Sequence, residues 1–167
     1  MTGEFRSVKR AMKNPGKVIA VIINSSQPNI SDFPIEILKL PNLKIIELNK
    51  QNIEIIPDEI IGVQNLEVLN LIDNNIKEIP SSICNCIQLK ELRIGGDIQG
   101  FPDCLKKMKN LKHLSIQSNT ANELMDELRE FEYLETAHFY LKGGNGVIFE
   151  HNRWWQIKKE TGIKHKY

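Results

Sequence analysis

Residues 66–83 read LEVLNLIDNNIKEIPSSI, and their apolar side chains recur at uneven intervals. Steps of three, two, five, three and four residues separate the members of this series, which are Leu66, Leu69, Leu71, Ile76, Ile79 and Ile83. An amphipathic helix repeats its apolar positions at steps of three and four, and a strand repeats them at steps of two. Neither period fits alone, so the stretch combines a short strand with a segment that returns to the same core.

The same arrangement recurs along the chain at a nearly fixed interval. Copies begin at Leu43, Leu66, Leu89, Leu111 and Leu134, which are 23, 23, 22 and 23 residues apart. An apolar residue followed by proline recurs in phase with them and extends the register back to about Ala20; these pairs are Phe33-Pro34, Ile56-Pro57, Ile79-Pro80 and Phe101-Pro102. A fixed period in this range predicts a solenoid, because one unit cannot bury its apolar face alone.

The pattern L-x-x-L-x-L-x-x-N-x-L-x-x-I-P-x-x-I-x-x-L-x-N resembles the leucine-rich repeat family, in its 23-residue intracellular and bacterial subclass, over roughly residues 20–141. The resemblance implies an α/β fold: a right-handed solenoid with a curved parallel sheet on the concave side and short helices or 3-10 turns on the convex side. We expect one domain over 1–167, with an N-terminal helical cap at 1–17, five to six units over 18–141, and a C-terminal hairpin and helix cap at 142–167.

Position nine of each unit favours asparagine, because an amide can bridge backbone groups left unpaired where the strand turns away. Asn74 and Asn119 fit this rule, whereas the other units carry Gln51, Asp97 and Pro28. We therefore expect local looseness at the departures. It should be greatest at residues 95–97, where the unit is one residue short.

Both ends of the repeat array carry capping signals. Phe5, Val8 and Met12 predict one apolar face of a short helix, which Asn14-Pro15-Gly16 ends. At the other end, two strand-like runs flank residues 143–146, Gly-Gly-Asn-Gly, which predicts that the last strand folds back antiparallel. A helix over 153–162 should follow and cover the open end of the core with Trp154 and Ile157.

The repeat that begins at Leu111 departs from the pattern in its second half. Leu124, Leu128 and Phe131 stand at helical spacing, so we expect a longer helix on the convex side. Its acidic residues are Glu123, Asp126, Glu127, Glu130 and Glu132. Such a run predicts a solvated face.

The strand residues at positions three, five and seven should line the concave surface. We expect the partner-binding residues to be Ile45, Glu47, Val68, Asn70, Ile72, Glu91, Arg93, His113, Ser115, His138 and Tyr140. An aliphatic patch beside Arg and Tyr is typical of an interface for a protein or peptide. The alternative is that Ile45, Val68 and Ile72 only satisfy strand propensity.

The sequence predicts no enzyme and no cofactor. His113 and His138 could approach one another across neighbouring strands, but no third ligand stands at a metal-binding spacing. Cys86 occupies a core position, and the other two cysteines lie on the convex side, remote from both histidines. Residues 143–146 lack the Lys-Ser/Thr continuation of a phosphate-binding loop.

The composition of the chain limits which partners and which cellular compartment we expect. The chain has 22 Lys and Arg against 21 Asp and Glu, so it does not as a whole attract nucleic acid or an anionic membrane. No apolar stretch is long enough to span a membrane, and residues 18–23 (VIAVII) are too short for a signal-peptide core. Three cysteines cannot all pair with each other, and Cys84 and Cys86 are too close in sequence for an ordinary bridge, which favours reduced thiols in a cytoplasmic setting. We also expect the chain to be a monomer.

Two alternatives stay open at this stage. The first is a secreted bacterial factor that meets a host protein, and the heavy use of Ile, Lys and Asn hints at an AT-rich bacterial genome. The second is binding of single-stranded nucleic acid by the C-terminal tail. That tail contains both basic and aromatic side chains, namely Arg153, Lys158, Lys159, Lys164, Lys166, Trp154, Trp155 and Tyr167.

Overall fold

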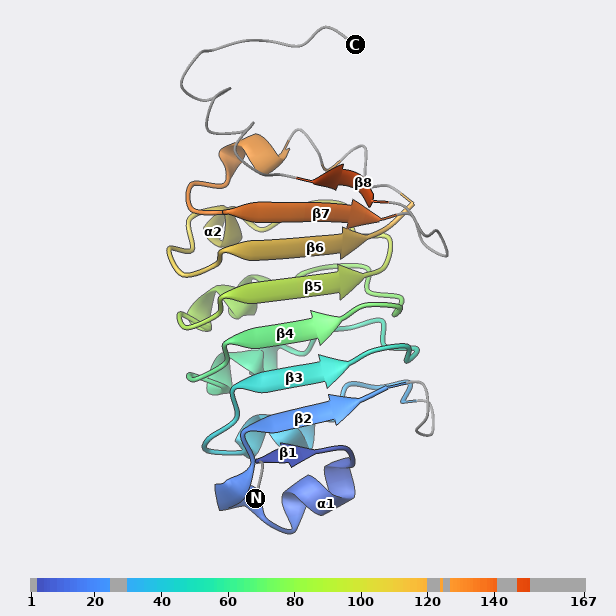
Figure 1. Cartoon of the computed structure of the whole chain (residues 1–167), viewed down its shortest axis with the longest axis vertical. Coiled ribbons are helices and arrows are strands. Elements are labelled where there is room, and N and C mark those ends of the chain that lie inside the picture. The colour runs from blue at the N-terminus through green and yellow to red at the C-terminus, as the bar shows by residue number, and fades with distance from the viewer. Residues whose placement is uncertain (1–2, 25–29, 120–123, 125–126, 141–146, 151–167) are drawn as a thin grey trace, which may run out of the picture.

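The computed structural model describes residues 3–24, 30–119, 124, 127–140 and 147–150, and it describes only the backbone of residues 129 and 147–150. Within these residues, eight strands form one sheet in chain order (Figure 1). They are β1 Glu4–Phe5, β2 Ala20–Ile23, β3 Ile45–Leu48, β4 Val68–Leu71, β5 Glu91–Gly95, β6 His113–Gln117, β7 Thr136–Tyr140 and β8 Val147–Glu150. Strands β1 to β7 pair in parallel, and β8 pairs antiparallel with β7.

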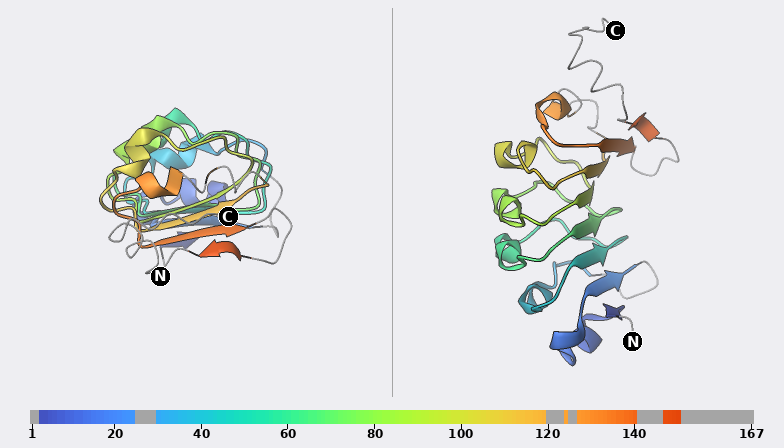
Figure 2. Two further views of the ribbon diagram at one scale, coloured as in Figure 1. Left: turned by 90° about the horizontal axis from the view of Figure 1, so that it is seen from above. Right: turned by 60° about the vertical axis from the view of Figure 1, so that its left-hand side comes forward.

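Short helical segments cover the side of the core opposite the sheet (Figure 2). The α-helices are α1 Val8–Met12 and α2 Asp103–Lys106, and the 3-10 helices are η1 Pro15–Lys17, η2 Ile35–Lys39, η3 Asp58–Gly62, η4 Ser81–Asn85 and η5 Glu127–Glu130. A proline precedes each segment from η2 to α2, where its missing N–H costs no helical hydrogen bond. This arrangement confirms the predicted α/β solenoid. No helix in the described part of the chain is long and apolar enough to cross a bilayer.

The inward leucines of successive units form one buried row, as the repeat period predicts. Leu69, Leu92 and Leu114 are register partners across β4, β5 and β6. All three are completely buried. Ile46 and Ala137 continue the row in β3 and β7. Burial of each large aliphatic side chain contributes roughly 1.5–3 kcal/mol, which chain entropy largely offsets.

The position-nine amide bridges successive units as predicted at Asn74. Its Nδ2 donates to the carbonyl oxygens of Leu48 (2.7 Å) and Leu71 (3.0 Å), and its Oδ1 accepts from the Ile53 N–H (3.1 Å). Gln51 makes the equivalent contact one unit earlier, because its Oε1 accepts from the Ile30 N–H at 2.8 Å. The expected looseness at Gln51 is therefore wrong, since the longer amide reaches the same backbone group. Pro28 lies outside the described residues.

The shortened unit is also closely packed at residues 95–97. The expectation of loose packing there is therefore wrong. Gly96 has φ +152°, and a Cβ there would lie 2.0 Å from the Ile76 oxygen. Asp97 takes a different part from that of Asn74. Its Oδ1 accepts from the Asn119 N–H (3.2 Å) and from the Ser118 hydroxyl (3.3 Å) in the following unit. The unit can be one residue shorter because the backbones of Gly95 and Gly96 lie directly against the preceding unit.

The N-terminal end differs from the prediction in three ways. Phe5 lies in β1, at the edge of the sheet, and the helix begins only at Val8. Ala11, not Met12, faces the core, because Met12 is 37% exposed. In addition, Ala20 pairs with Ile45, which stands at position three of its unit. The first unit therefore begins near residue 18 and is two residues longer than the uniform period assumed.

The acidic run after Leu111 is not simply a solvated face. Leu124, Leu128 and Phe131 are buried as predicted. Leu124 is helical and Glu127–Glu130 form the 3-10 helix η5, while residues 120–123 and 125–126 of the expected longer helix lie outside the described residues. Lys106 Nζ, whose side chain is 9% exposed, lies 2.8 Å from Glu130 Oε2 and 3.0 Å from Glu127 Oε2. The hydrogen bond to Glu130 is the largest influence and raises the pKa of Lys106 above its usual value, although burial acts in the opposite direction. These carboxylates therefore compensate a nearly buried cation on α2.

The antiparallel return at the C-terminal end is confirmed by the pairing of β7 with β8. The connecting turn at 143–146 and the helix expected over 153–162 lie outside the described residues. The same holds for the basic tail, so its binding of nucleic acid stays a prediction.

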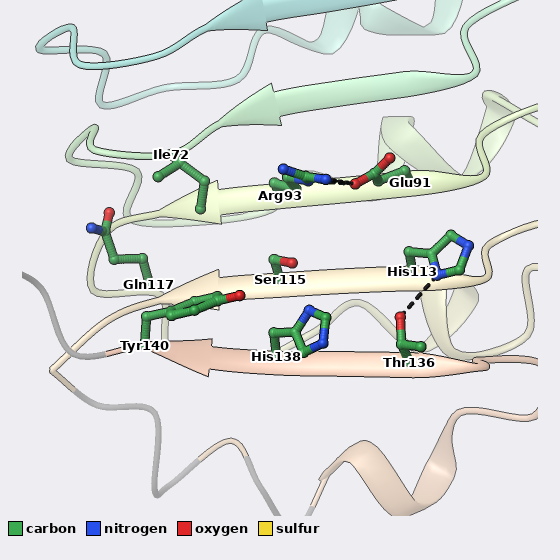
Figure 3. Close-up of a pocket in the computed structure, with 9 residues that line it drawn as sticks. All are labelled: Ile72, Glu91, Arg93, His113, Ser115, Gln117, Thr136, His138 and Tyr140. Atoms are coloured by element: carbon green, nitrogen blue, oxygen red, sulfur yellow. Dashed lines mark hydrogen bonds and ion pairs between the residues drawn. The ribbon is translucent and has the colours of Figure 1, made fainter. Parts of the chain in front are cut away.

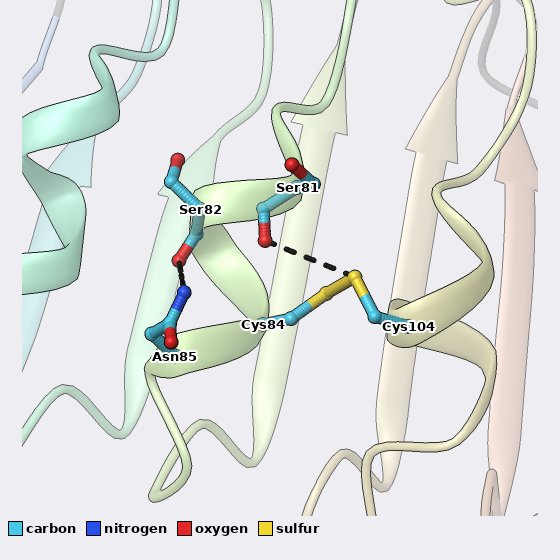
Figure 4. Close-up of a disulfide and its surroundings, with 5 residues drawn as sticks. All are labelled: Ser81, Ser82, Cys84, Asn85 and Cys104. Atoms are coloured by element: carbon cyan, nitrogen blue, oxygen red, sulfur yellow. Dashed lines mark hydrogen bonds between the residues drawn. A yellow bond between two sulfur atoms is a disulfide. The ribbon is translucent and has the colours of Figure 1, made fainter.

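The expectation of three reduced cysteines is wrong. Cys84 in η4 and Cys104 in α2 form a disulfide across the convex layer, with a Cα–Cα distance of 5.9 Å (Figure 4). The Cys104 sulfur also lies 3.8 Å from the Ser81 carbonyl oxygen. The two cysteines are 20 residues apart, and stacking of consecutive units brings residues at about one repeat length side by side. Cys86 stays a buried free thiol, and burial raises its pKa to about 11.

Candidate protein-binding face

Strand alternation and register place the predicted binding residues in rows on the concave face. Position three supplies Ile45, Val68, Glu91, His113 and Thr136, and position five supplies Glu47, Asn70, Arg93, Ser115 and His138. Successive side chains of a strand point to opposite faces, so these rows face away from the buried leucines. The pairing thus brings the predicted site residues of β3 to β7 onto one surface.

The aliphatic part of this face is less exposed than the sequence suggested. Ile45, Val68 and Ile72 are each half-buried. Among the described residues, the exposed large aliphatic side chains lie off the concave face, as with Ile55, which is 73% exposed. Asn70 is itself buried, and its Oδ1 accepts from the Ile72 N–H at 3.3 Å. Neighbouring strands crowd the side chains between them, so the face offers a continuous surface instead of separate projecting groups.

A hollow of about 580 Å³ occupies the C-terminal half of the face (Figure 3). Its lining consists of Ile72, Glu91, Arg93, His113, Ser115, Gln117, Thr136, His138 and Tyr140. Thr136 and Gln117 stand at positions three and seven, so their place in the repeat already indicated them, although they were not among the predicted binding residues. Ile45, Glu47, Val68 and Asn70 lie beside the hollow and outside its lining.

The polar groups of the hollow are largely held by one another. Arg93 donates to Glu91 of the same strand. His113 Nδ1 lies 2.8 Å from Thr136 Oγ1, and the ring centroids of His138 and Tyr140 are 6.1 Å apart at 58°. Within the described residues, no group of three His, Cys, Asp or Glu side chains could hold a metal ion. The hollow therefore presents hydrogen-bonding and aromatic groups in defined positions.

One wall of the hollow depends on a glycine. Gln117 reaches past β5 to Asp73, where its Oε1 accepts from the backbone N–H (2.8 Å) and its Nε2 donates to Oδ1 (2.5 Å). A Cβ on Gly95 would lie 2.5 Å from the Asp73 nitrogen and 2.8 Å from Gln117 Oε1. The absence of a side chain at this position leaves the path open for the bridge, which ties β6 to the end of β4.

A ladder of charges runs along the edge where the strands begin. Glu67 accepts from Lys44 Nζ (2.8 Å) and from Lys90 Nζ (2.6 Å). The hydrogen bond from Lys44, followed by that from Lys90, lowers the pKa of Glu67 from 4.5 to about 2. The ladder links three consecutive units on the rim of the concave face.

We expect Glu67→Gln to lower the free energy of unfolding at pH 7 by up to about 1 kcal/mol, because exposed ion pairs are weak. The folded pKa lies below the unfolded one, so the stabilisation by Glu67 is complete above about pH 5 and is lost as the pH falls through 2. Urea unfolding of both proteins at pH 7 and near pH 2 measures this change. A difference between the two proteins that stays the same at low pH would contradict it.

The parallel sheet with one strand per unit, the buried leucine row and the bridging amide of Asn74 together define a solenoid of short strand-and-turn repeats. A family model described as a leucine-rich repeat region matches residues 30–154. The chain belongs to the leucine-rich repeat family, as the sequence pattern predicted.

Solved structures show the same fold at low sequence identity. A leucine-rich repeat protein of Leptospira interrogans matches with TM-score 0.57 and 18% identity, over 83% of this chain and 48% of that one. Internalin C2 of Listeria monocytogenes matches with TM-score 0.55 and 20% identity, over 81% and 57%. The plant peptide hormone receptor RGFR1, solved in complex with RGF2, matches with TM-score 0.54 and 21% identity, over 75% and 21%. The chain thus spans about half or less of most of these proteins. No curated protein matches it.

Proposed function

We propose that the chain is a non-catalytic interaction module that binds a protein or peptide partner on the concave face of its sheet. The fold commonly serves protein–protein interaction, and one structural neighbour is a peptide hormone receptor. The observation that carries the proposal is the hollow lined by Ile72, Arg93 and Tyr140, beside the half-buried Ile45 and Val68.

The chemistry of this surface suits a protein segment. Arginine and tyrosine are the residue types that most often anchor interfaces, whereas lysine is depleted there. None of the side chains that line the described hollow is a lysine. Ile72 and Val68 would bury their remaining apolar area under a partner, while Ser115, Thr136 and the two histidines offer hydrogen bonds to its backbone. We therefore assign the partner-binding residues to the register rows of β3 to β7.

The test is a pull-down from the source organism with the chain and a double variant, Val68→Arg with Ile72→Glu. We expect the variant to lose the partner by at least tenfold, because both charges would be desolvated at the interface. The matched control is Ile55→Arg with Ile61→Glu, which makes the same chemical change at exposed positions of the return segments. Recovery of the same proteins by the chain and the concave-face variant would refute the proposal.

A second proposal concerns the compartment. The disulfide between Cys84 and Cys104 supports an extracytoplasmic protein, because such bonds persist mainly in oxidising compartments. The cytoplasmic prediction had relied on reduced thiols, and that premise fails for this pair. An extracytoplasmic interaction module also agrees with the secreted alternative drawn from the sequence.

The state of the cysteines in the native organism tests this second proposal. We expect the isolated chain to react with a thiol-alkylating reagent only after denaturation, at Cys86, and at all three cysteines only after reduction. Mass spectrometry counts the alkyl groups. Alkylation of Cys84 and Cys104 in rapidly quenched, unreduced cells would place the chain in a reducing compartment.

A further inference from the structure

The N-terminal end of the solenoid carries an uncompensated positive charge. Residues 3–17 contain five cations and one acidic residue, Glu4. The cations are Arg6, Lys9, Arg10, Lys13 and Lys17, and all five are exposed. None of them forms an ion pair with another residue in the described part of the chain. By contrast, Lys44 and Lys90 on the rim are paired with Glu67. This end therefore presents cations that are free to bind an external anion.

The helix α1 directs these cations outward. Ala11 is buried and Val8 packs against the core. Lys9 and the C-cap residue Lys13 are four residues apart, so they lie on one side of the helix, and Arg10 is exposed next to them. Figure 1 shows α1 and β1 at the opposite end of the molecule from β7. The basic surface is thus separate from the polar hollow on the concave face.

Exposed aliphatic groups accompany the cations. Met12 is 37% exposed and Ile19 is 46% exposed. Ile19 lines an open hollow of about 840 Å³ together with Phe5, Lys17 and Lys44. Within the described residues, none of the exposed large hydrophobic side chains is aromatic. Cations beside exposed aliphatic groups suit the interface of an anionic bilayer, whereas single-stranded nucleic acid favours aromatic stacking.

The body of the repeat array has the opposite charge. Residues 18–150 contain 12 Lys and Arg against 19 Asp and Glu. The net charge near zero of the whole chain therefore conceals an acidic repeat array between two basic ends of the sequence, since residues 151–167 add five Lys and Arg against one glutamate. An anionic surface would attract the end and repel the body, so the solenoid would stand on its N-terminal end. In that orientation the concave face stays accessible to a partner.

We propose that the N-terminal end docks peripherally on an anionic phospholipid surface. Arg6, Lys9, Arg10, Lys13 and Lys17 bind the phosphate-bearing headgroups, and Met12 and Ile19 contact the outer edge of the acyl region. The near-neutral charge of the whole chain does not rule out this contact. Electrostatic attraction to a membrane falls off within about 10 Å, so it depends on the charges of the protein that lie closest to the lipid surface.

Co-sedimentation of the full chain with lipid vesicles tests the proposal. One set of vesicles contains phosphatidylcholine alone, and the other contains about 30% phosphatidylserine at about 0.1 M salt. We expect at least tenfold tighter binding to the anionic vesicles, which weakens as the salt concentration rises. The variant R6E/K9E/R10E/K13E should lose at least tenfold in affinity for them.

The matched control makes the same charge change at the other basic end of the sequence, as K158E/K159E/K164E/K166E. We expect it to bind anionic vesicles within about threefold of the native chain, since the proposed contacts are retained. Circular dichroism and thermal melting check that each variant is folded, and R6Q/K9Q/R10Q/K13Q replaces the charge-reversed variant if that one is unfolded. Equal binding to both vesicle types, or an equal loss in the control, would overturn the proposal. Displacement from vesicles by a tighter-binding single-stranded oligonucleotide would reassign the end to nucleic acid.

Discussion

Replacing Gly96 with alanine is expected to lower the free energy of unfolding by at least about 3 kcal/mol. The new Cβ would lie 2.0 Å from the oxygen and 2.3 Å from the nitrogen of Ile76. Both are backbone atoms of the preceding unit, so no side-chain rotation can relieve the overlap. The φ of +152° adds strain for any residue with a Cβ. Urea unfolding followed by circular dichroism measures the loss.

The matched control for this prediction is Gly16→Ala, because a Cβ built at Gly16 has no heavy atom within 4 Å outside its own local segment of chain. We expect the control to change stability by less than about 1 kcal/mol. In a repeat protein each unit is stabilised mainly by its neighbours, so the damage at Gly96 should separate the units on either side of it. A variant at Gly96 that unfolds with the same midpoint as the control would show that the two units can move apart without cost.

The repeat architecture could be predicted because it depends on a period, and a period is visible in one sequence. Each inward leucine, such as Leu69 or Leu92, is specified by its spacing from the next, and the register rows follow from equal unit lengths. The prediction failed where the length changes. The first unit is longer, so uniform spacing misplaced Ala20, which pairs with Ile45 at position three.

Contacts between units were harder to foresee than contacts within them. The bond between Cys84 and Cys104 joins residues 20 apart, which only the stacking of two return segments brings together. The pairing of Lys106 with Glu127 and Glu130 likewise spans consecutive units. Residues of complementary chemistry that stand about one repeat length apart are therefore candidates for contacts between units, because a solenoid places such residues side by side.

The sequence predicted which residues share the concave face, but it did not predict the hollow that they line. Position five placed Arg93, Ser115 and His138 on one face, and their pairing agrees. The hollow itself depends on side-chain bridges such as that from Gln117 to Asp73, which spans 44 residues and passes a glycine. No local pattern specifies a contact that skips a whole unit. The shape of the site thus follows from one irregular repeat inside a regular array.

Regular and irregular units therefore serve different purposes in this chain. The units that begin at Leu43 and Leu66 follow the 23-residue rule, and their position-nine residues, Gln51 and Asn74, tie each unit to the one before it. The shortened unit that begins at Leu89 gives up this bridge, and Gly95 opens the path that Gln117 uses. The regular bridges should accordingly carry a large share of the stability.

We expect Asn74→Ala to lower the free energy of unfolding by about 2–4 kcal/mol, because a buried amide with several partners would be lost. Asn74 is 1% exposed, and its removal leaves the Ile53 N–H and the Leu48 and Leu71 carbonyls without their bridging group. Asn74→Asp should be at least as damaging, since a carboxylate would face the two carbonyl oxygens that the amide now satisfies.

The exposed Asn52 supplies the control for this position. Its replacement with alanine should change stability by less than about 0.5 kcal/mol. Chemical denaturation of the variants at Asn74 and Asn52 gives the comparison directly, and hydrogen exchange of the Ile53 amide reports the bridge itself. If Asn74→Ala unfolded at the same urea concentration as the Asn52 variant, with the Ile53 amide equally protected, water would be replacing the side chain. The amide bridge would then not be what couples one unit to the next, and the apolar row alone would hold the array together.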